Sequence, residues 1–449
     1  YTGQRLRTKG NGGATPGVGD VFTGVGGIVE ESTEEDVDLV TLDVVTDLGF
    51  AEITSNSAYF EHRRPRLQDM TRYMLELSEA YGYNYELFPE YTHDTVGIEH
   101  WRQFTQEVRL VSMTPESPVE YVAGAFYRTQ EGSLGPNGMR APGLSDFLNE
   151  FYFGPGETSG RPDDNDFIGV QQTDATEWAV FGEVTFNLTE RWNIVLGGRS
   201  FDHKIDGYTD IALPMDEELL DKWGVPGCAP LQGGMDPSKF PCTYSRTVMD
   251  NAIRDSVYKV NSSYQFERVD ALLFATIAEG FRPGGANYFD AISQLGVDPK
   301  FLGYDPDKAT SYEIGVKSML LDDRMRMNAS IYQIDWEGIQ LNTMLYGYPV
   351  TTNGDEAEIK GVELDLTTLI SDALQLDLSV AMLDAKLTED TLTTPEIDGQ
   401  KGDRLPGSAE VQATLALRYE TEFANSMRWW ARLAGSYSGN VNAYLNDNQ

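Results

Sequence analysis

The chain of 449 residues has a formal net charge of −37, with 34 Lys and Arg against 71 Asp and Glu. This balance argues against a nucleic-acid partner, because binding to phosphates requires clustered Lys and Arg side chains. No run of about 18 apolar residues occurs, which excludes helical membrane spans. A β-barrel remains open, because it shows only alternate residues to lipid and keeps a low overall hydropathy.

The alternation of apolar and polar residues divides the chain into two parts. Residues 1–36 are Gly-rich and weakly patterned, and we expect an extracellular loop with a partial strand there. From residue 37 to residue 449, apolar and polar residues alternate with the two-residue period of a β-strand, and we expect the transmembrane barrel there. Clear examples are residues 178–186, 312–320, 362–366, 374–382 and 411–419. The predicted strands run for about 10–15 residues, enough for a tilted strand to cross a bilayer.

The links between the predicted strands alternate in length. We expect about 14 strands. The short links are residues 46–49, 113–118, 188–191, 266–268, 321–323, 371–372 and 420–426. The long links are residues 62–102, 130–175, 203–254, 282–307, 343–354 and 389–406. This sorting predicts an all-β fold, a transmembrane antiparallel β-barrel with short periplasmic turns and long extracellular loops. A β-sandwich or a β-propeller gives no reason for short and long links to alternate in this way.

The two cysteines, Cys228 and Cys242, lie close together in a Gly- and Pro-rich stretch. A loop of about 15 residues is a common disulfide span. We therefore predict a disulfide, which implies an oxidising compartment. Two thiolates are too few for a structural zinc site.

Sites for metals, phosphates and catalysis have little support in the sequence. The four His residues show no metal-ligand spacing. Asp163, Asp164 and Asp166 are candidate calcium ligands, with a plain acidic loop as the alternative. The Gly-rich residues 280–285 precede no helix, so they do not predict a phosphate cradle. No catalytic motif stands out, and we expect neither an enzyme nor a cofactor.

Several segments resemble the barrel of TonB-dependent receptors, the energised importers of the outer membrane. They are residues 103–112, 121–128, 177–202, 279–287, 311–340, 359–366 and 405–419. Each match is weak alone, but their order and spacing are typical of the family. The family has an N-terminal plug, a TonB box and a barrel of 22 strands. From the comparison with this domain arrangement, we expect this sequence to lack the plug domain and the last strands of the barrel.

The resemblance implies a function in the outer membrane of a Gram-negative bacterium. It implies energised uptake of a scarce solute, with an iron–siderophore complex as the default. The implied partners are TonB, through the missing N-terminal region, a small solute ligand, and outer-membrane lipid and lipopolysaccharide. Candidate ligand contacts in the loops are Arg282, Asn287, Tyr288 and Phe289. The alternative is a passive channel or a structural barrel within a larger surface assembly.

Overall fold

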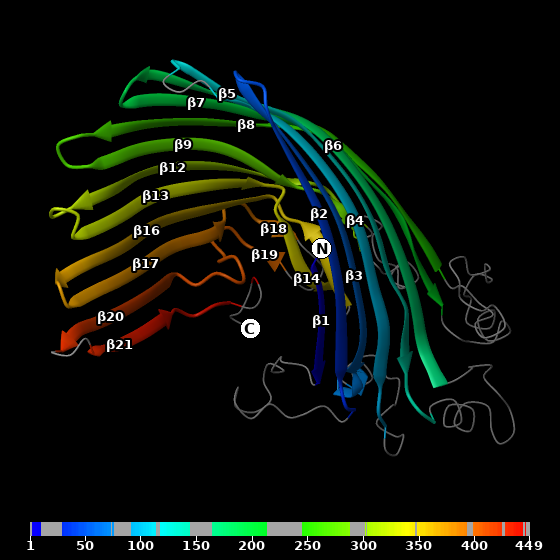
Figure 1. Ribbon diagram of the computed structural model, residues 1–449. Coiled ribbons are helices and arrows are strands. Elements are labelled where there is room, and N and C mark those ends of the chain that lie inside the picture. The colour runs from blue at the N-terminus through cyan, green and yellow to red at the C-terminus, as the bar shows by residue number, and fades with distance from the viewer. Residues whose placement is uncertain are drawn as a thin grey trace, which may run out of the picture.

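A computed structural model describes residues 2–9, 29–72, 74–75, 91–113, 117–143, 164–212, 245–287, 301, 303–345, 348–392, 398–423, 427–442 and 445. In this part of the chain, fifteen strands form one antiparallel sheet. Figure 1 shows that the sheet curves into a wall, with β1 and β21 at its two edges. The predicted antiparallel barrel fold is confirmed, with fifteen strands where about 14 were expected.

The main sheet follows the chain as a meander. Its strands are β1 (Thr2–Lys9), β2 (Ser32–Asp47), β3 (Ala51–Asp69), β4 (Asp94–Ser112), β5 (Val119–Arg140), β6 (Asn165–Thr189), β7 (Trp192–Ala212), β8 (Ser245–Phe266), β9 (Ala271–Arg282), β12 (Asp307–Leu320), β13 (Met325–Glu337), β16 (Glu356–Ser371), β17 (Leu374–Leu387), β20 (Val411–Phe423) and β21 (Met427–Ser438).

Three short hairpins stand outside the main sheet. They are β10 (Gly285–Ala286) with β11 (Gly303–Tyr304), β14 (Gln340–Leu345) with β15 (Tyr348–Asn353), and β18 (Thr391–Leu392) with β19 (Asp398–Gly399). Residues 71–72 and 74–75 are helical. No helix in the described ranges is long and apolar enough to cross a membrane.

Short turns and long connections alternate along the meander, as predicted. The turns between β12 and β13 and between β16 and β17, for example, lie at the predicted short links. In the first of these turns, Asp322 and Asp323 have positive φ angles of 53° and 63°. Asp tolerates this left-handed conformation because its short side chain forms local hydrogen bonds. The short turns lie at one end of the sheet, and the long connections lie at the other (Figure 1).

Strand lengths depart from the prediction in one half of the sheet. The strands from β9 to β21 in the main sheet contain 12–16 residues. In contrast, β3–β8 contain 19–25 residues and extend into the links predicted at residues 62–102, 130–175 and 203–254. These extensions are largely polar, so hydrophobic alternation does not mark them. Backbone hydrogen bonds between neighbouring strands hold them together.

The start of the chain contributes a short strand to the sheet. Thr2–Lys9 form β1, which pairs with β2 in antiparallel register. The strand that was predicted to begin at residue 37 begins at Ser32.

One face of the sheet carries a continuous apolar belt. The register places Ile314, Ile331 and Val362 in one row, because residues opposite one another point to the same face. Exposed large apolar residues of this face include Leu42, Val44, Tyr59, Phe104, Val108, Tyr127, Trp178, Val180, Phe186, Leu196, Tyr258, Val260, Tyr264, Leu273, Ile277, Tyr312, Ile314, Ile331, Val362, Met382, Leu415 and Leu433. An exposed apolar belt with aromatic residues is typical of a surface that faces lipid.

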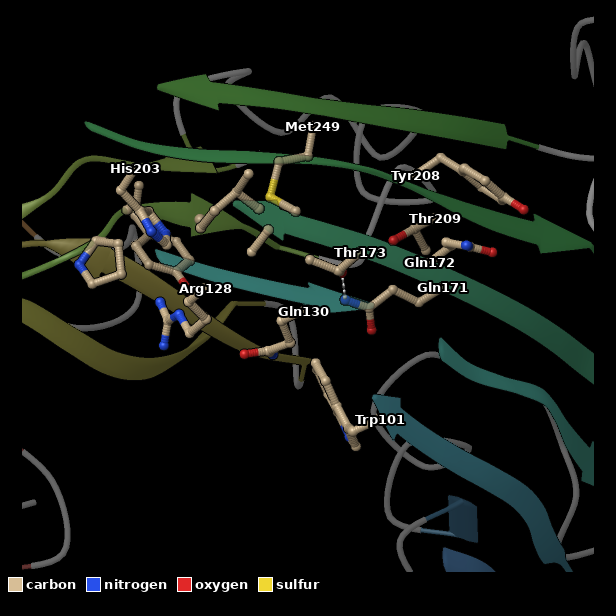
Figure 2. A pocket seen from close by; sticks show the side chains of 16 residues that line it. Trp101, Arg128, Gln130, Gln171, Gln172, Thr173, His203, Tyr208, Thr209 and Met249 are labelled. Carbon is tan, nitrogen blue, oxygen red and sulfur yellow. Dashed lines mark hydrogen bonds between the residues drawn. The ribbon is translucent and has the colours of Figure 1, made fainter. Parts of the chain in front are cut away.

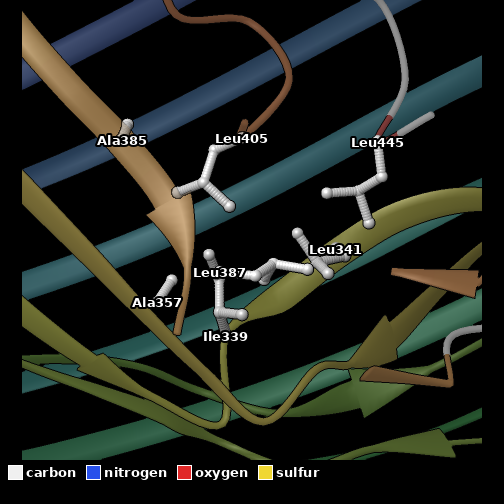
Figure 3. Packing of buried hydrophobic residues seen from close by; sticks show 7 residues of the cluster. All are labelled: Ile339, Leu341, Ala357, Ala385, Leu387, Leu405 and Leu445. Atoms are coloured by element: carbon white, nitrogen blue, oxygen red, sulfur yellow. The ribbon is translucent and has the colours of Figure 1, made fainter. Parts of the chain in front are cut away.

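A small hydrophobic cluster fastens the long connections of the second half of the sheet. It consists of Ile339, Leu341, Ala357, Ala385, Leu387, Leu405 and Leu445 (Figure 3). Leu387, at the end of β17, is 1% exposed, and Leu341 of β14 is 5% exposed. The cluster joins the β14–β15 hairpin to the ends of β16 and β17. These connections are therefore packed structures rather than open loops.

Glycines face aromatic rings at several cross-strand pairs of the lumen wall. Direct pairs are Gly124 with Phe181, Gly132 with Trp101, Gly315 with Phe274, and Gly361 with Tyr332. A Cβ atom at any of these glycines would overlap the ring of its partner. The rings therefore lie flat on the strand beside them instead of standing up into the lumen.

Candidate ligand-binding site

The extended ends of β4–β8 and the connection between β9 and β12 enclose a pocket on the inner face of the wall. Its volume is about 280 Å³ (Figure 2). The lining residues are Trp101, Arg128, Gln130, Gln171, Gln172, Thr173, Ala175, His203, Ile205, Tyr208, Thr209, Met249, Pro283, Gly284, Gly285 and Tyr304. This size approaches the lower end of the range for small-molecule sites.

The strand register brings the pocket residues together from distant parts of the sequence. Arg128 of β5 lies opposite Glu177 of β6, which in turn lies opposite His203 of β7. The next row, two residues farther along these strands, contains Gln130 and Ala175. Alternate residues of a strand point to the same face. The rows therefore form one continuous polar surface on the inner side.

Glu177 sits at the centre of a charged cluster beside the pocket. Its Oε1 accepts a hydrogen bond of 2.6 Å from Nη2 of Arg199. Its Oε2 lies 3.0 Å from Nη2 of Arg128 and 3.7 Å from Nδ1 of His203. The Glu177 side chain is only 11% exposed. Two guanidinium groups share this one carboxylate, so the cluster carries an excess positive charge.

One ring nitrogen of His203 has no hydrogen-bond partner among the described residues. Its side chain is 5% exposed. Its Nδ1 faces Glu177, whereas its Nε2 is buried and makes no hydrogen bond to any residue in the described ranges. A buried polar atom without a partner costs free energy unless a ligand or water pairs with it. His203 therefore places a buried, unsatisfied nitrogen in the wall of the pocket.

The charge of the pocket lining differs sharply from that of the whole chain. None of the described lining residues is Asp or Glu, although the sequence contains 71 of them. The ionisable nitrogen groups of the lining are those of Arg128 and His203. Amide and hydroxyl groups supply the other polar contacts. This lining favours an anionic or neutral occupant over a cation.

The outer face of the same strands carries the opposite charge. Glu131, Asp174, Asp206 and Asp250 lie directly opposite one another across β5–β8. Their row lies beyond the apolar belt, outside the lipid-facing part of the strands. Burial and the nearby charge of Glu131 raise the pKa of Asp174. The register thus places this acidic row on the face opposite the pocket.

Replacing one carboxylate of this row tests its electrostatic cost. We expect Asp174→Asn to raise the free energy of unfolding at neutral pH by about 0.5 kcal/mol, because like charges opposite one another repel. A raised pKa in the folded state means that the Asp174 charge destabilises the fold at neutral pH. Protonation removes this cost, so the gain should shrink as pH falls through the folded-state pKa and vanish below the lower pKa of the unfolded state. Urea unfolding in lipid vesicles at several pH values measures both effects.

Asp206→Asn is the matched control for this prediction. Asp206 accepts two hydrogen bonds of 2.8 Å from Nζ of Lys204, so its charge already has a partner. We expect no stabilisation from this variant, because it removes an attraction together with the repulsion. An equal gain in the free energy of unfolding in both variants would show that the ion pair with Lys204 does not offset the repulsion within the row.

The connection between β9 and β12 forms one wall of the pocket through close backbone packing. A Cβ atom at Gly284 would overlap the backbone oxygen of Tyr304 and lie 2.9 Å from Nδ2 of Asn251 in β8. A Cβ atom at Gly285 would overlap the Tyr304 ring. The Gly-rich stretch at residues 280–285 therefore allows this connection to lie against the long strands.

Arg282, a predicted ligand contact, is engaged in holding this connection in place. Its Nε donates a hydrogen bond of 2.9 Å to Oδ2 of Asp307, whose side chain is 1% exposed. It also donates to the Gln340 backbone oxygen at 3.2 Å, and its guanidinium lies 4.7 Å from the centre of the Trp336 ring. Arg282 does not line the pocket, whereas the neighbouring Pro283, Gly284 and Gly285 do.

Asn287 ties two connections to each other. Its Nδ2 donates to the backbone oxygens of Phe301 at 2.8 Å and Thr351 at 2.6 Å. Its Oδ1 accepts a hydrogen bond of 2.7 Å from the Thr351 nitrogen. The residue is 6% exposed and lies outside the pocket lining. The other two predicted ligand contacts, Tyr288 and Phe289, lie outside the described residues.

The remaining predicted site residues stay predictions. Cys228, Cys242 and Asp163 lie outside the described residues, and so does the side chain of Asp166. Asp164 is described, and its Oδ2 accepts a hydrogen bond of 2.9 Å from the Gly143 nitrogen. Within the described ranges, no group of three or more His, Cys, Asp and Glu residues could hold a metal ion.

Comparison with known proteins gives a consistent family match. The family model described as TonB dependent receptor-like, beta-barrel, matches residues 12–449. The metal-pseudopaline receptor CntO of Pseudomonas aeruginosa is 24% identical over 265 residues, which cover 59% of this chain and 31% of that protein.

Solved structures show the same fold. The ferric yersiniabactin uptake receptor FyuA from Yersinia pestis matches with a TM-score of 0.64 at 15% identity, over 92% of this chain and 51% of that one. The siderophore receptor PiuA from Acinetobacter baumannii matches with a TM-score of 0.55 at 14% identity, over 91% of this chain and 57% of that one. The chain thus spans about half the length of these structures and about a third of CntO.

Proposed function

This chain belongs to the family of TonB-dependent receptor β-barrels of the Gram-negative outer membrane, and we propose that it forms the wall of a receptor for energised uptake of a metal chelate. The default cargo in this proposal is an iron–siderophore complex. TonB supplies the energy, and outer-membrane lipid and lipopolysaccharide surround the apolar belt. The receptor binds and transports its cargo and catalyses no reaction.

The observation that supports this function best is the acid-free lining of the pocket. A bare metal cation prefers carboxylate, imidazole or thiolate ligands. The described lining offers one imidazole, that of His203, with the Arg128 guanidinium nearby. A preformed chelate needs no such ligands, because the chelator already surrounds the metal. Its anionic periphery instead accepts hydrogen bonds from guanidinium, amide and hydroxyl donors.

The names of the similar proteins agree with this choice. One curated relative is named as a metal-pseudopaline receptor, and one similar structure is described as a ferric yersiniabactin uptake receptor. Both names specify a metal bound to a carrier molecule. The pocket geometry and these names together favour a chelate over an uncomplexed nutrient.

Energised uptake is tested against the passive-channel alternative in cells. The receptor gene is deleted and restored in a strain with and without functional TonB, and uptake of radioactive iron is followed with a panel of ferric chelates. We expect uptake to require both the receptor and TonB. Uptake that continues at the same rate without TonB would contradict an energised receptor and favour a passive channel.

The role of Arg128 can be measured directly by binding. We expect Arg128→Met to weaken the binding of an anionic probe, ferric citrate, by about 10- to 30-fold, because a charge-assisted hydrogen bond is lost. Isothermal titration calorimetry on the purified receptor measures this change. Lys259→Met is the matched control, since Lys259 donates a hydrogen bond of 3.1 Å to Glu183 and does not line the pocket. Equal losses in both variants would point to the overall lumen charge instead.

A further inference from the structure

We propose that Trp101 is a stacking platform that selects chelators carrying an aromatic ring, and that Gly132 is the residue that positions it. This inference rests on the proposed function, because it concerns the cargo of the same pocket. It adds a specificity that the positive charge of the site cannot provide, since Arg128 attracts aromatic and aliphatic anions alike.

The position of the indole follows from its cross-strand pair. Trp101 of β4 lies directly opposite Gly132 of β5. A Cβ atom at residue 132 would overlap three atoms of the six-membered ring of the indole. The absence of that atom allows the indole to lie flat on the β5 backbone. Any other residue at position 132 would lift or rotate the ring.

The indole on Gly132 also borders the pocket. Gly132 is buried, whereas Trp101 is half-buried and lines the pocket. The indole thus both covers the glycine and bounds the pocket. Figure 2 shows Trp101 at the edge of the pocket, and Gln130 is among the other lining residues. The site therefore combines a flat aromatic surface with nearby hydrogen-bonding groups.

The chemistry around the indole determines which planar group fits it. An indole face attracts cations as well as aromatic rings. A cationic occupant is disfavoured, because Arg128 lies in the same lining and no described lining residue is Asp or Glu. A catechol, phenol or heteroaromatic ring of an anionic chelator satisfies both requirements. Its ring stacks on Trp101 while its oxygen atoms accept hydrogen bonds from the pocket.

Two ferric complexes distinguish stacking from charge. Ferric tris-catecholate and ferric citrate are both anionic, but only the first carries aromatic rings. We expect Trp101→Leu to weaken the binding of ferric tris-catecholate about 5- to 10-fold and to change that of ferric citrate less than about twofold. Gly132→Ala should cause the same selective loss while keeping the indole. Calorimetric titration of the intact receptor gives the two affinities and their ratio.

Gly361→Ala is the matched control for the glycine. The Tyr332 ring lies on Gly361 in the same way, and neither residue lines the pocket. This variant should change stability as Gly132→Ala does and leave the affinity ratio unchanged. Thermal unfolding of each variant confirms that it folds.

The outcomes separate this inference from the proposed function. If the wild-type receptor binds both complexes and Trp101→Leu leaves their affinity ratio unchanged, the platform is wrong and the proposed function stands. The same ratio change in Gly361→Ala as in Gly132→Ala would overturn the positioning role of Gly132. If the wild-type receptor binds no ferric chelate at all, the proposed function fails and the platform fails with it.

Discussion

Leu415→Arg is expected to destabilise the folded barrel in lipid by about 2–4 kcal/mol, whereas Thr414→Arg, at the adjacent position, should change stability by less than about 1 kcal/mol. The two residues are neighbours in β20 and point to opposite faces of the wall. The pair therefore tests which face meets lipid, with strand, depth and introduced residue held nearly constant.

The neighbours of each residue explain the difference. Leu415 is 48% exposed and lies opposite Leu378 in β17 and Gly435 in β21, within the apolar belt. An Arg there must bury its charge in hydrocarbon or bend toward the interface. Thr414 lies opposite Ser379 and Ser436 on the inner face. An Arg at that position remains hydrated.

The measurement is denaturant unfolding of the refolded protein in lipid vesicles, followed by tryptophan fluorescence. Equal destabilisation by the two substitutions would show that both faces of β20 are buried to a similar extent. A larger effect for Thr414→Arg would mean that the face assigned to the interior is the one that meets lipid. Either result would contradict the lipid-facing role of the belt.

The fold could be predicted from the sequence because its two main signals are local. Alternation places Val362, Leu364 and Leu366 on one face within a single strand, and the lengths of the links fix the order of turns and loops. The polar extensions of β3–β8 carry no such signal. In residues 165–175, for instance, backbone pairing with the neighbouring strands replaces hydrophobic patterning, so the sequence indicated a loop.

The candidate site could not be predicted, because it depends on register between strands. Arg128, Glu177 and His203 come from three strands, and no spacing in the sequence links them. The segments 121–128 and 177–202 resembled the family, which placed Arg128 and Glu177 on strands but not in one row, whereas His203 fell in the long link predicted at residues 203–254. Arg282 and Asn287 stood out because they lie in a recognisable Gly-rich segment. Their polar groups hold the connections together, and their contact with a ligand stays a prediction.

Trp101 and Gly132 could not be predicted for the same reason, because their contact also depends on the register between strands. Each is ordinary by itself, and their importance follows from lying opposite one another in β4 and β5. A signal that could have found them is the pairing of a glycine with an aromatic residue across a predicted hairpin. Using it requires a register, and the bulge between Val96 and Glu99 shifts the register of this strand pair.

Glu177→Gln is expected to lower the free energy of unfolding by about 2–3 kcal/mol. Removing one partner of a buried ion pair costs about 3–5 kcal/mol, because the remaining charge stays uncompensated. The estimate is reduced here because Arg128 and Arg199 are 29% and 31% exposed and can recover part of their hydration. Glu183→Gln is the matched control on the same strand and face.

The control should cost less than about 1 kcal/mol, as is typical of exposed ion pairs. The side chains of Glu183 and its partner Lys259 are 39% and 47% exposed, against 11% for Glu177. Equal costs would mean that burial does not decide the strength of these pairs. Unfolding in lipid vesicles, measured for both variants under the same conditions, provides the comparison.

Ligand binding should respond to Glu177→Gln in the opposite direction from stability. The substitution removes a negative charge beside Arg128 and leaves both guanidinium groups in place, so the affinity for ferric citrate should hold or rise. The variant should thus lose stability and still bind an anion at least as well as the wild type. This result would show that Glu177 stabilises the fold through its ion pairs, while its negative charge lowers the affinity for an anionic cargo. A joint loss of stability and affinity would instead assign Glu177 to the geometry of the pocket itself, because the arginines would then no longer point to the ligand without it.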